Sequence, residues 1–157
     1  MRIFIMRHGE AQNFAPSDAE RPLTPRGELQ SRQMAEHLAE QLDGQLDMVW
    51  VSPYLRAQQT WQTMVGCLPP AAKVMTVDDI TPYGEAEQVA AYIKAVIGVE
   101  RPETLLVVSH LPLVGYLTAE LVAGIQPPMF QTSAIAVIDF NPETELATFV
   151  EQVIPHG

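Results

Sequence analysis

Three short segments place histidine and arginine side chains at points where apolar runs of the sequence end. Arg7-His8-Gly9 follows the apolar run 3–6, Ser52 to Arg56 follows 48–51, and Ser109-His110 closes the run that starts at residue 104. Arginine presents a planar fork of N–H donors that matches phosphate oxygens, and a neutral imidazole is a nucleophile near its ordinary pKa of about 6.5. These residue types point to chemistry on a phosphoryl group.

Taken alone, the tripeptide Arg7-His8-Gly9 fits a second interpretation better, namely a basic strand end that faces solvent. Gly9 lacks a Cβ atom, so it allows either a sharp turn or the close approach of a ligand. The choice between the two interpretations depends on whether the three segments meet in space, and therefore on the elements that carry them.

The hydrophobic pattern predicts strands and helices that alternate along the chain. Short apolar runs rich in β-branched residues predict strands, and apolar residues repeated every three or four positions predict amphipathic helices. The expected strands are 3–6, 48–51, 73–77, 104–110, 129–140 and 146–153, the last two as an edge hairpin. The expected helices are Pro25 to about Leu42, a helix capped by Ser52-Pro53, one through 89–97 closed by Gly98, and one from Leu111-Pro112 to near Gly124.

This alternation predicts a single α/β domain over residues 1–157, with three α/β/α layers and a mainly parallel central sheet. In such folds, ligands collect outside the carboxyl ends of the strands. Since each of the three segments follows a strand, the fold would bring Arg7, His8, Arg56 and His110 to one edge of the sheet. The sequence therefore predicts a phosphate site made by these four side chains.

Composition narrows the classes of partner and location. The chain has 157 residues, 47% hydrophobic and 18% charged, which suits one globular domain. Nine basic against nineteen acidic residues give a formal net charge of −10, which disfavours binding to nucleic acid or to an anionic membrane. The single Cys67 and the early interruption of the first apolar run by Arg7 predict a cytoplasmic protein. The four histidines have no metal-ligand spacing, so neither a metal nor a cofactor is expected.

With these motifs in view, the sequence resembles the histidine phosphatase superfamily, which has the phosphoglycerate mutase-like fold. The resemblance rests on Arg7-His8-Gly9-Glu10, on the block 52–60 (SPYLRAQQT) and on Ser109-His110, in this order. The short length, the stretch 21–27 (RPLTPRG) and the stretch 108–116 (VSHLPLVGY) resemble the bacterial SixA-type phosphohistidine phosphatases. That similarity extends over nearly the whole chain, including 127–130 and 132–136.

The resemblance implies a role for each site residue. His8 would be the nucleophile that becomes phosphorylated, and Arg7, Arg56 and His110 would form the phosphate pocket. The implied substrate is a histidine-phosphorylated protein, such as a phosphotransfer domain of a signalling system, and the implied enzyme is a monomer without cofactor. Gly9 and Arg21 would help to bind the substrate, although Arg21 could equally form a local ion pair with Asp18 or Glu20.

One component of the family site has no clear counterpart here. Many members carry an acidic residue that protonates an alkoxide leaving group, and only Glu85 and Asp79 are candidates for this general acid. Imidazole leaves more easily than an alkoxide, so the missing acid favours a phosphohistidine substrate. Two alternatives stay open, a phosphatase for small phosphate esters and a non-catalytic phosphoprotein-binding domain. A mutase would need a closed pocket, for which this short chain has no insertion.

Overall fold

The computed structural model describes residues 1–156, so that only Gly157 of the predicted domain lies outside the described residues. Six strands form one sheet in the order β3-β2-β4-β1-β5-β6. The strands are β1 (Arg2–Arg7), β2 (Met48–Val51), β3 (Lys73–Thr76), β4 (Thr104–Ser109), β5 (Ile135–Phe140) and β6 (Ala147–Val153). The first four are mutually parallel, and β5 and β6 run antiparallel at one edge. The mainly parallel sheet and the edge hairpin were both predicted, and both are confirmed.

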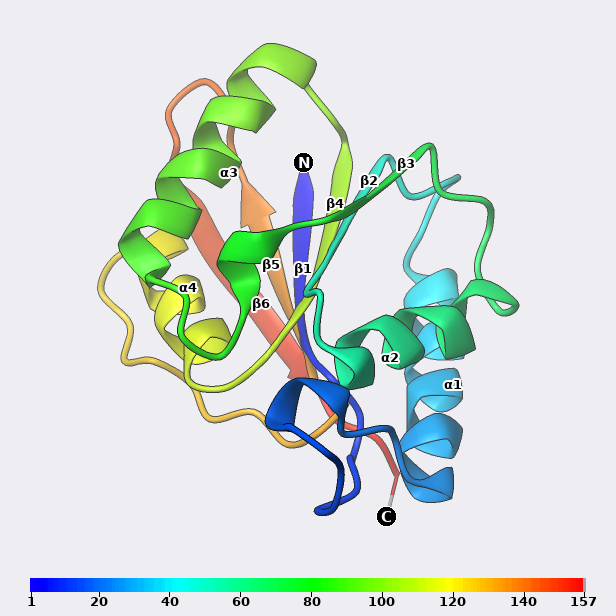
Figure 1. Ribbon diagram of the computed structural model, residues 1–157. Coiled ribbons are helices and arrows are strands. Elements are labelled where there is room, and N and C mark those ends of the chain that lie inside the picture. Colours follow the sequence, from blue (N-terminus) through cyan, green and yellow to red (C-terminus); the bar gives the residue numbers. More distant parts are fainter. Residues whose placement is uncertain (157) are drawn as a thin grey trace.

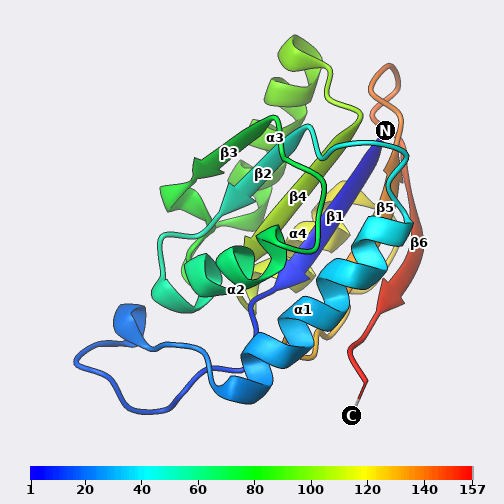
Figure 2. The same cartoon turned by 90° about the vertical axis from the view of Figure 1, so that its right-hand side faces the viewer.

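Helices cover both faces of this sheet and complete the three layers (Figure 1). One face carries α1 (Pro25–Glu40) and α2 (Leu55–Val65), which lie in front of the strands in Figure 2. The opposite face carries α3 (Ala86–Glu100) and α4 (Leu113–Leu121). The short helices η1 (Asp18–Glu20) and η2 (Asp78–Ile80) lie in the loops that follow β1 and β3. Two apolar cores result, one on each side of the sheet.

The register between β1 and β4 determines which residues lie side by side at the carboxyl ends of the two strands. Both strands are covered on their two faces, which explains why their sequences are apolar without alternation. Arg7 pairs with Ser109, and the N–H of His8 donates to the carbonyl oxygen of Ser109 at 2.9 Å. The residues that follow the two strands, His8 and His110, therefore leave the sheet side by side.

The ends of three helices differ from the prediction, and one of these helices, α4, spans Leu113–Leu121 where the sequence predicted Leu111-Pro112 to near Gly124. Helix α1 begins as expected, because the Thr24 side chain accepts the N–H of Gly27. Helix α2 begins later, at Leu55, so the predicted cap at Ser52-Pro53 is wrong and the Ser52 hydroxyl is used elsewhere. Helix α3 was predicted to end at Gly98, but it continues to Glu100. It ends there because Arg101 takes the left-handed conformation (φ 50°) that is usual for a glycine after a helix.

The strand predicted at 129–140 is shorter in the structure, because its first residues lie beside the candidate site and are not part of the sheet. Strand β5 begins only at Ile135, and the chain before it crosses the carboxyl end of β1. There the N–H of Ser133 donates to the carbonyl oxygens of Arg7 and His8.

None of the helices within residues 1–156 is both long and apolar enough to cross a bilayer.

Candidate active site

Three side chains from distant parts of the sequence meet at the carboxyl edge of the sheet. His8 follows β1, Arg56 lies in the first turn of α2, and His110 follows β4. The ring centroids of His8 and His110 are 5.0 Å apart, and the Nε of Arg56 lies 3.3 Å from the Nε2 of His8. All three residues are at least nine-tenths buried. The convergence predicted for these three residues is present in the structure.

The two hydrogen bonds of the His8 ring define its tautomer. Nδ1 lies 2.7 Å from the carbonyl oxygen of Gly9, which can only accept a hydrogen bond. Nε2 faces the Nε–H of Arg56, which can only donate. Nδ1 therefore carries the proton, and Nε2 presents its lone pair toward the arginine. A neutral imidazole in this orientation has Nε2 as its nucleophilic atom.

The surroundings of His8 keep its imidazole neutral over most of the pH range. Burial, together with the smaller effect of the positive charges of Arg56, Arg7 and Arg21, lowers the pKa of His8 from 6.5 to about 4, while the hydrogen bond to Gly9 opposes the shift. Removing a cation from water and placing it beside arginines disfavours protonation. At neutral pH, the His8 ring is therefore neutral in nearly every molecule.

Arg7 turns toward the loop that precedes β5. Its NH1 group donates to the carbonyl oxygen of Phe130 at 2.9 Å, which orients the guanidinium. Its Nε atom is buried and has no hydrogen-bond partner within residues 1–156, and the same holds for the Nδ1 atom of His110. An unpaired buried donor, such as the Nε–H of Arg7, is costly, so it marks a position where an anion would be bound favourably.

Arg56 is held on several sides. Its guanidinium carbon lies 5.0 Å from the centre of the Tyr54 ring, and the edge of that ring meets the imidazole of His110, also at 5.0 Å between centroids. NH1 and NH2 of Arg56 donate to the backbone carbonyl and the carboxylate of Asp18, at 2.6 and 3.2 Å. The arginine fork is therefore oriented before any ligand binds.

Asp18 is also the partner in the local ion pair that was predicted for Arg21. NH1 of Arg21 donates to the second carboxylate oxygen of Asp18 at 3.0 Å, and Nε donates to the carbonyl of Gln12 at 2.7 Å. Glu20, the other candidate partner, instead accepts the hydroxyl of Ser17. The two arginines lower the pKa of the Asp18 carboxyl. The local ion pair exists, and it links Arg21 to Arg56; a substrate-binding role for Arg21 stays a prediction.

Gly9 is required for space in the folded chain. A Cβ atom at this position would lie 2.8 Å from Oγ of Ser31 and 2.9 Å from the carbonyl oxygen of Gly27. Its N–H donates to Oγ1 of Thr60, whose own hydroxyl donates to the carbonyl of Arg56. These contacts tie the loop after β1 to α2. The predicted role of Gly9 in substrate binding stays a prediction.

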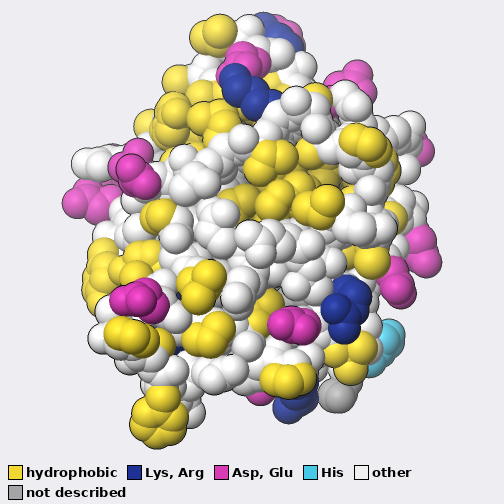
Figure 3. Space-filling model, turned by 45° about the vertical axis from the view of Figure 1, so that its right-hand side comes forward, with side chains coloured by type: hydrophobic (Ala, Val, Ile, Leu, Met, Phe, Trp, Pro, Cys, Tyr) yellow, Lys and Arg dark blue, Asp and Glu magenta, His cyan; other side chains and the backbone are white. Residues whose placement is uncertain are grey.

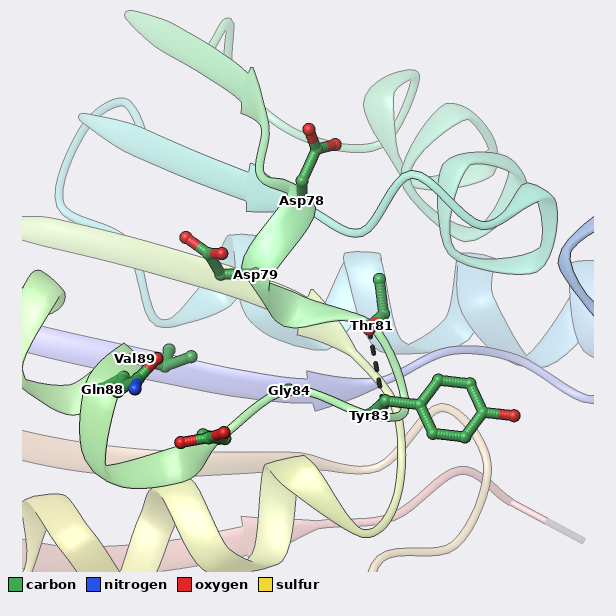
Figure 4. A pocket seen from close by; sticks show the side chains of 8 residues that line it. Asp78, Asp79, Thr81, Tyr83, Gly84, Gln88 and Val89 are labelled. Atoms are coloured by element: carbon green, nitrogen blue, oxygen red, sulfur yellow. Dashed lines mark hydrogen bonds between the residues drawn. The ribbon is translucent and has the colours of Figure 1, made fainter.

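The two candidate general acids lie in a separate cavity. Glu85 and Asp79 line a hollow of about 250 Å³ together with Asp78, Tyr83 and neighbouring residues (Figure 4). None of Arg7, His8, Arg56 and His110 belongs to its lining. In Figure 4, the Asp78 and Asp79 carboxylates point in different directions, and the Tyr83 ring points away from both. No hydrogen bond or ion pair within residues 1–156 links either acid to His8, and their acid role stays a prediction.

Sequence reasoning did not identify three residues that shape the site. Asp18 was considered only as a partner of Arg21, Ser52 was interpreted as a helix cap, and Thr60 was part of a motif without a role. For Ser52 the sequence showed only a cap pattern, and the structure, in which α2 begins at Leu55, shows that its hydroxyl contacts His110 instead. The contacts of Asp18 and Thr60 span 38 and 51 positions and follow from tertiary structure alone.

The surface and the metal-ligand inventory show what the site does not resemble. On the face drawn in Figure 3, lysine and arginine side chains are few and lie apart, with apolar and acidic side chains between them. In the part of the chain that the structure describes, no group of three His, Cys, Asp or Glu side chains could hold a metal ion. The arrangement is that of an anion pocket built from arginine and neutral histidine.

Comparison with known proteins agrees with this geometry. A model of the histidine phosphatase superfamily (branch 1) matches residues 3–80. The chain is 45% identical to phosphohistidine phosphatase SixA of Escherichia coli (strain K12), over 99% of this chain and 94% of the relative. A SixA homolog from Haemophilus influenzae is 42% identical over 87% of this chain and 86% of the relative.

The structural comparison covers the same extent. The solved structure of the protein histidine phosphatase SixA complexed with tungstate matches with a TM-score of 0.92 and 45% identity, over 99% of this chain and 97% of that chain. The predicted resemblance, which extended over nearly the whole chain, is confirmed. The chain belongs to the histidine phosphatase superfamily, branch 1, and within it to the SixA phosphohistidine phosphatases.

Proposed function

We propose that this enzyme dephosphorylates phosphohistidine in a protein through a covalent intermediate on Nε2 of His8. The observation that carries the proposal is the state of the His8 ring. Its Nδ1 proton is held by Gly9, and its Nε2 lone pair lies beside Arg56. A nucleophile of this kind needs no base to remove a proton before it attacks.

Two arginines and one neutral histidine surround the place where the phosphoryl group would be transferred. Arg56 would exchange its contact with the His8 lone pair for phosphoryl oxygens, and the free Nε of Arg7 and Nδ1 of His110 would each donate to another oxygen. Donors that are fixed beforehand stabilise the charge of the transferring group without reorganisation. Tungstate, bound in the similar solved structure, is a tetrahedral oxyanion like phosphate.

The proposed substrate follows from the leaving group. In the first step, the P–N bond of the substrate breaks while a P–N bond to Nε2 of His8 forms, and the substrate imidazole leaves as a neutral ring if its other nitrogen carries a proton. Water then cleaves phospho-His8 and releases inorganic phosphate. The transfer is nearly symmetric between two imidazoles, so a carboxylic acid is not required. In agreement with this, Glu85 lines a cavity to which none of Arg7, His8, Arg56 and His110 contributes.

A protein substrate and a cytoplasmic location complete the proposal. The relative in Escherichia coli is described as a phosphohistidine phosphatase, which favours a histidine-phosphorylated protein, such as a phosphotransfer domain, as the substrate here too. Cys67 is a free thiol, as is usual in the reducing cytoplasm. A monomeric state, and the lack of nucleic-acid or membrane binding, stay predictions of the sequence.

The test is rapid quenching of the enzyme with a phosphotransfer domain that carries radiolabelled phosphohistidine. We expect label on one histidine of the enzyme, and none after His8→Ala, with turnover reduced about a thousandfold or more. His37→Ala is the matched control, since His37 lies on α1, and it should keep the label. Label that persists in His8→Ala would refute the intermediate.

A second assay separates the proposed substrate from small phosphate esters. We expect kcat/KM for the phosphohistidine protein to exceed that for sugar phosphates by at least about a hundredfold, because an alkoxide leaving group needs a general acid far more than an imidazole does. Comparable values would favour the small-ester alternative. Hydrolysis of an aryl phosphate that disappears in His8→Ala would exclude a non-catalytic binding domain.

A further inference from the structure

His110 makes one hydrogen bond through its ring, and the partner is Ser52. The Oγ atom of Ser52 lies 2.7 Å from Nε2 of His110. Both residues are almost completely buried, at 0% and 1% exposure, so bulk solvent does not reach this contact. The other ring nitrogen, Nδ1, has no partner within residues 1–156. The proton of the His110 ring can therefore lie on either nitrogen as far as this single contact is concerned.

The second contact of Ser52 resolves this ambiguity. The N–H of Tyr54 donates to the same Oγ atom at 3.2 Å, which occupies one of its acceptor positions. If Nε2 of His110 also donated to Oγ, the serine hydroxyl proton would have no acceptor, and the Nδ1 lone pair would be unpaired as well. If the hydroxyl donates to Nε2, every proton around Oγ is used and only an N–H on Nδ1 is left free. Buried unpaired groups are costly, so the second arrangement is favoured.

The backbone around Ser52 holds the hydroxyl in place. Its N–H donates to the carbonyl of Val108 in the neighbouring strand, at 3.1 Å. Its carbonyl oxygen accepts from the side chain of Gln58 at 2.9 Å. The edge contact with the Tyr54 ring restrains His110 from another side. Serine and histidine are thus fixed relative to each other by β2, β4 and α2.

We propose that Ser52 is a positioning residue, which donates its hydroxyl proton to Nε2 of His110 and so keeps the ring proton on Nδ1, where it serves as a donor to the transferring phosphoryl group. The proposal rests on the proposed function of the site for the identity of that group, but the tautomer itself does not depend on it. Burial lowers the pKa of His110 to about 2, with smaller contributions from His8 in its protonated form and from Arg56, so the ring stays neutral and its tautomer decides from which nitrogen it can donate.

The direct test is the tautomer of His110 in the wild-type protein. In a long-range ¹H–¹⁵N spectrum with labelled histidine, assigned by comparison with His110→Gln, we expect a protonated Nδ1 and an unprotonated Nε2. In Ser52→Ala, the ring should shift toward the other tautomer. A wild-type ring that carries its proton on Nε2 would overturn the proposal, whatever the substrate of the enzyme is.

Kinetics with an aryl phosphate supply the second test, which does not require the protein substrate. We expect Ser52→Ala to lower kcat about 10- to 100-fold with little change in KM, and Ser52→Thr, which keeps a hydroxyl, to recover most of the loss. In the His110→Ala background, Ser52→Ala should cause no further loss, because its effect passes through His110. A further loss of the same size in that background would contradict the proposal.

Ser109→Ala is the matched control. Ser109 is also completely buried, and its hydroxyl donates to the carbonyl of Ile80 at 2.7 Å, away from the His110 ring nitrogens. Its removal costs a buried hydrogen bond of similar kind. We expect this variant to leave the His110 tautomer unchanged. If Ser109→Ala shifted the tautomer as much as Ser52→Ala does, the effect would be general loosening and the proposal would fail.

Discussion

Arginines lie at both ends of the parallel strands, but in different environments. At the carboxyl end, Arg56 is almost fully buried and its fork is divided between the His8 ring and Asp18. At the amino end, Arg2 and Arg101 line an open cavity of about 1310 Å³ and pair with Asp139 and Glu143, each at 2.8 Å. Both amino-end pairs are largely exposed to solvent.

The difference shows what distinguishes a site from a surface. Exposed pairs are screened by water and contribute little, about 0–1 kcal/mol each. A buried arginine beside a neutral histidine raises the free energy of the unliganded state, and so does a buried donor without a partner. A bound anion would relieve both costs. Burial and incomplete pairing, more than the number of arginines, therefore identify the functional end of the sheet.

The largest expected effect separates the two ends directly. Arg56→Ala should lower kcat/KM for an aryl phosphate by about 10²–10³, because it removes a fixed donor to the transferring group. Arg2→Ala, at the other end, should leave kcat/KM within about twofold. Steady-state kinetics of both variants provide the measurement, with circular dichroism as a check on folding. Equal losses in the two variants would contradict the comparison.

The second effect is a dependence of stability on pH that arises at the carboxyl end. The pKa of His8 falls from 6.5 to about 4 on folding, so the unfolded state binds more protons between these values and stability falls as pH decreases through this window. The contribution amounts to about 3 kcal/mol.

Urea titrations between pH 7 and pH 4 measure this contribution. Wild type should lose about 3 kcal/mol more than His8→Gln over that range, because glutamine does not titrate. The NMR titration of the His8 ring should have its midpoint near pH 4. A midpoint near 6.5 would show that the site does not keep the ring neutral.

The third effect compares two glycines, one at each end. Gly9→Ala should destabilise the fold by about 1–3 kcal/mol, since its Cβ would press on Gly27 and Ser31. Gly44→Ala, at the rim of the amino-end cavity, meets nothing within 4 Å and should change stability by less than about 1 kcal/mol. Thermal or urea unfolding measures both. Similar changes for the two glycines would argue against a packing role for Gly9.

The smallest effect belongs to the exposed ion pairs. Arg101→Ala should cost less than about 1 kcal/mol, and the cost should shrink as salt is added, because charges in solvent are screened. Unfolding at low and at high ionic strength measures this. A cost that is large and independent of salt would mean that the amino end contains more than surface pairs.

Much of the fold was predictable because burial leaves a local trace in the sequence. Strands β1 and β4 read as unbroken apolar runs since both of their faces are covered, and α1 shows its cap at Thr24-Pro25. The boundaries that failed are those where a distant partner replaces the local rule. Arg101 ends α3 in a conformation usual for glycine, and the hydroxyl of Ser52 faces His110 instead of a helix N-terminus.

The sequence by itself determined that Arg7, His8, Arg56 and His110 stand after strands or at a helix start, and hence at one edge of a parallel sheet. Only the tertiary structure decided which atoms face one another. The lone pair of His8, the link from Asp18 to both Arg21 and Arg56, and the contact between Ser52 and His110 join residues 1 to 58 positions apart. Such contacts depend on side-chain direction and burial, and neither is written in the spacing of residues along the chain.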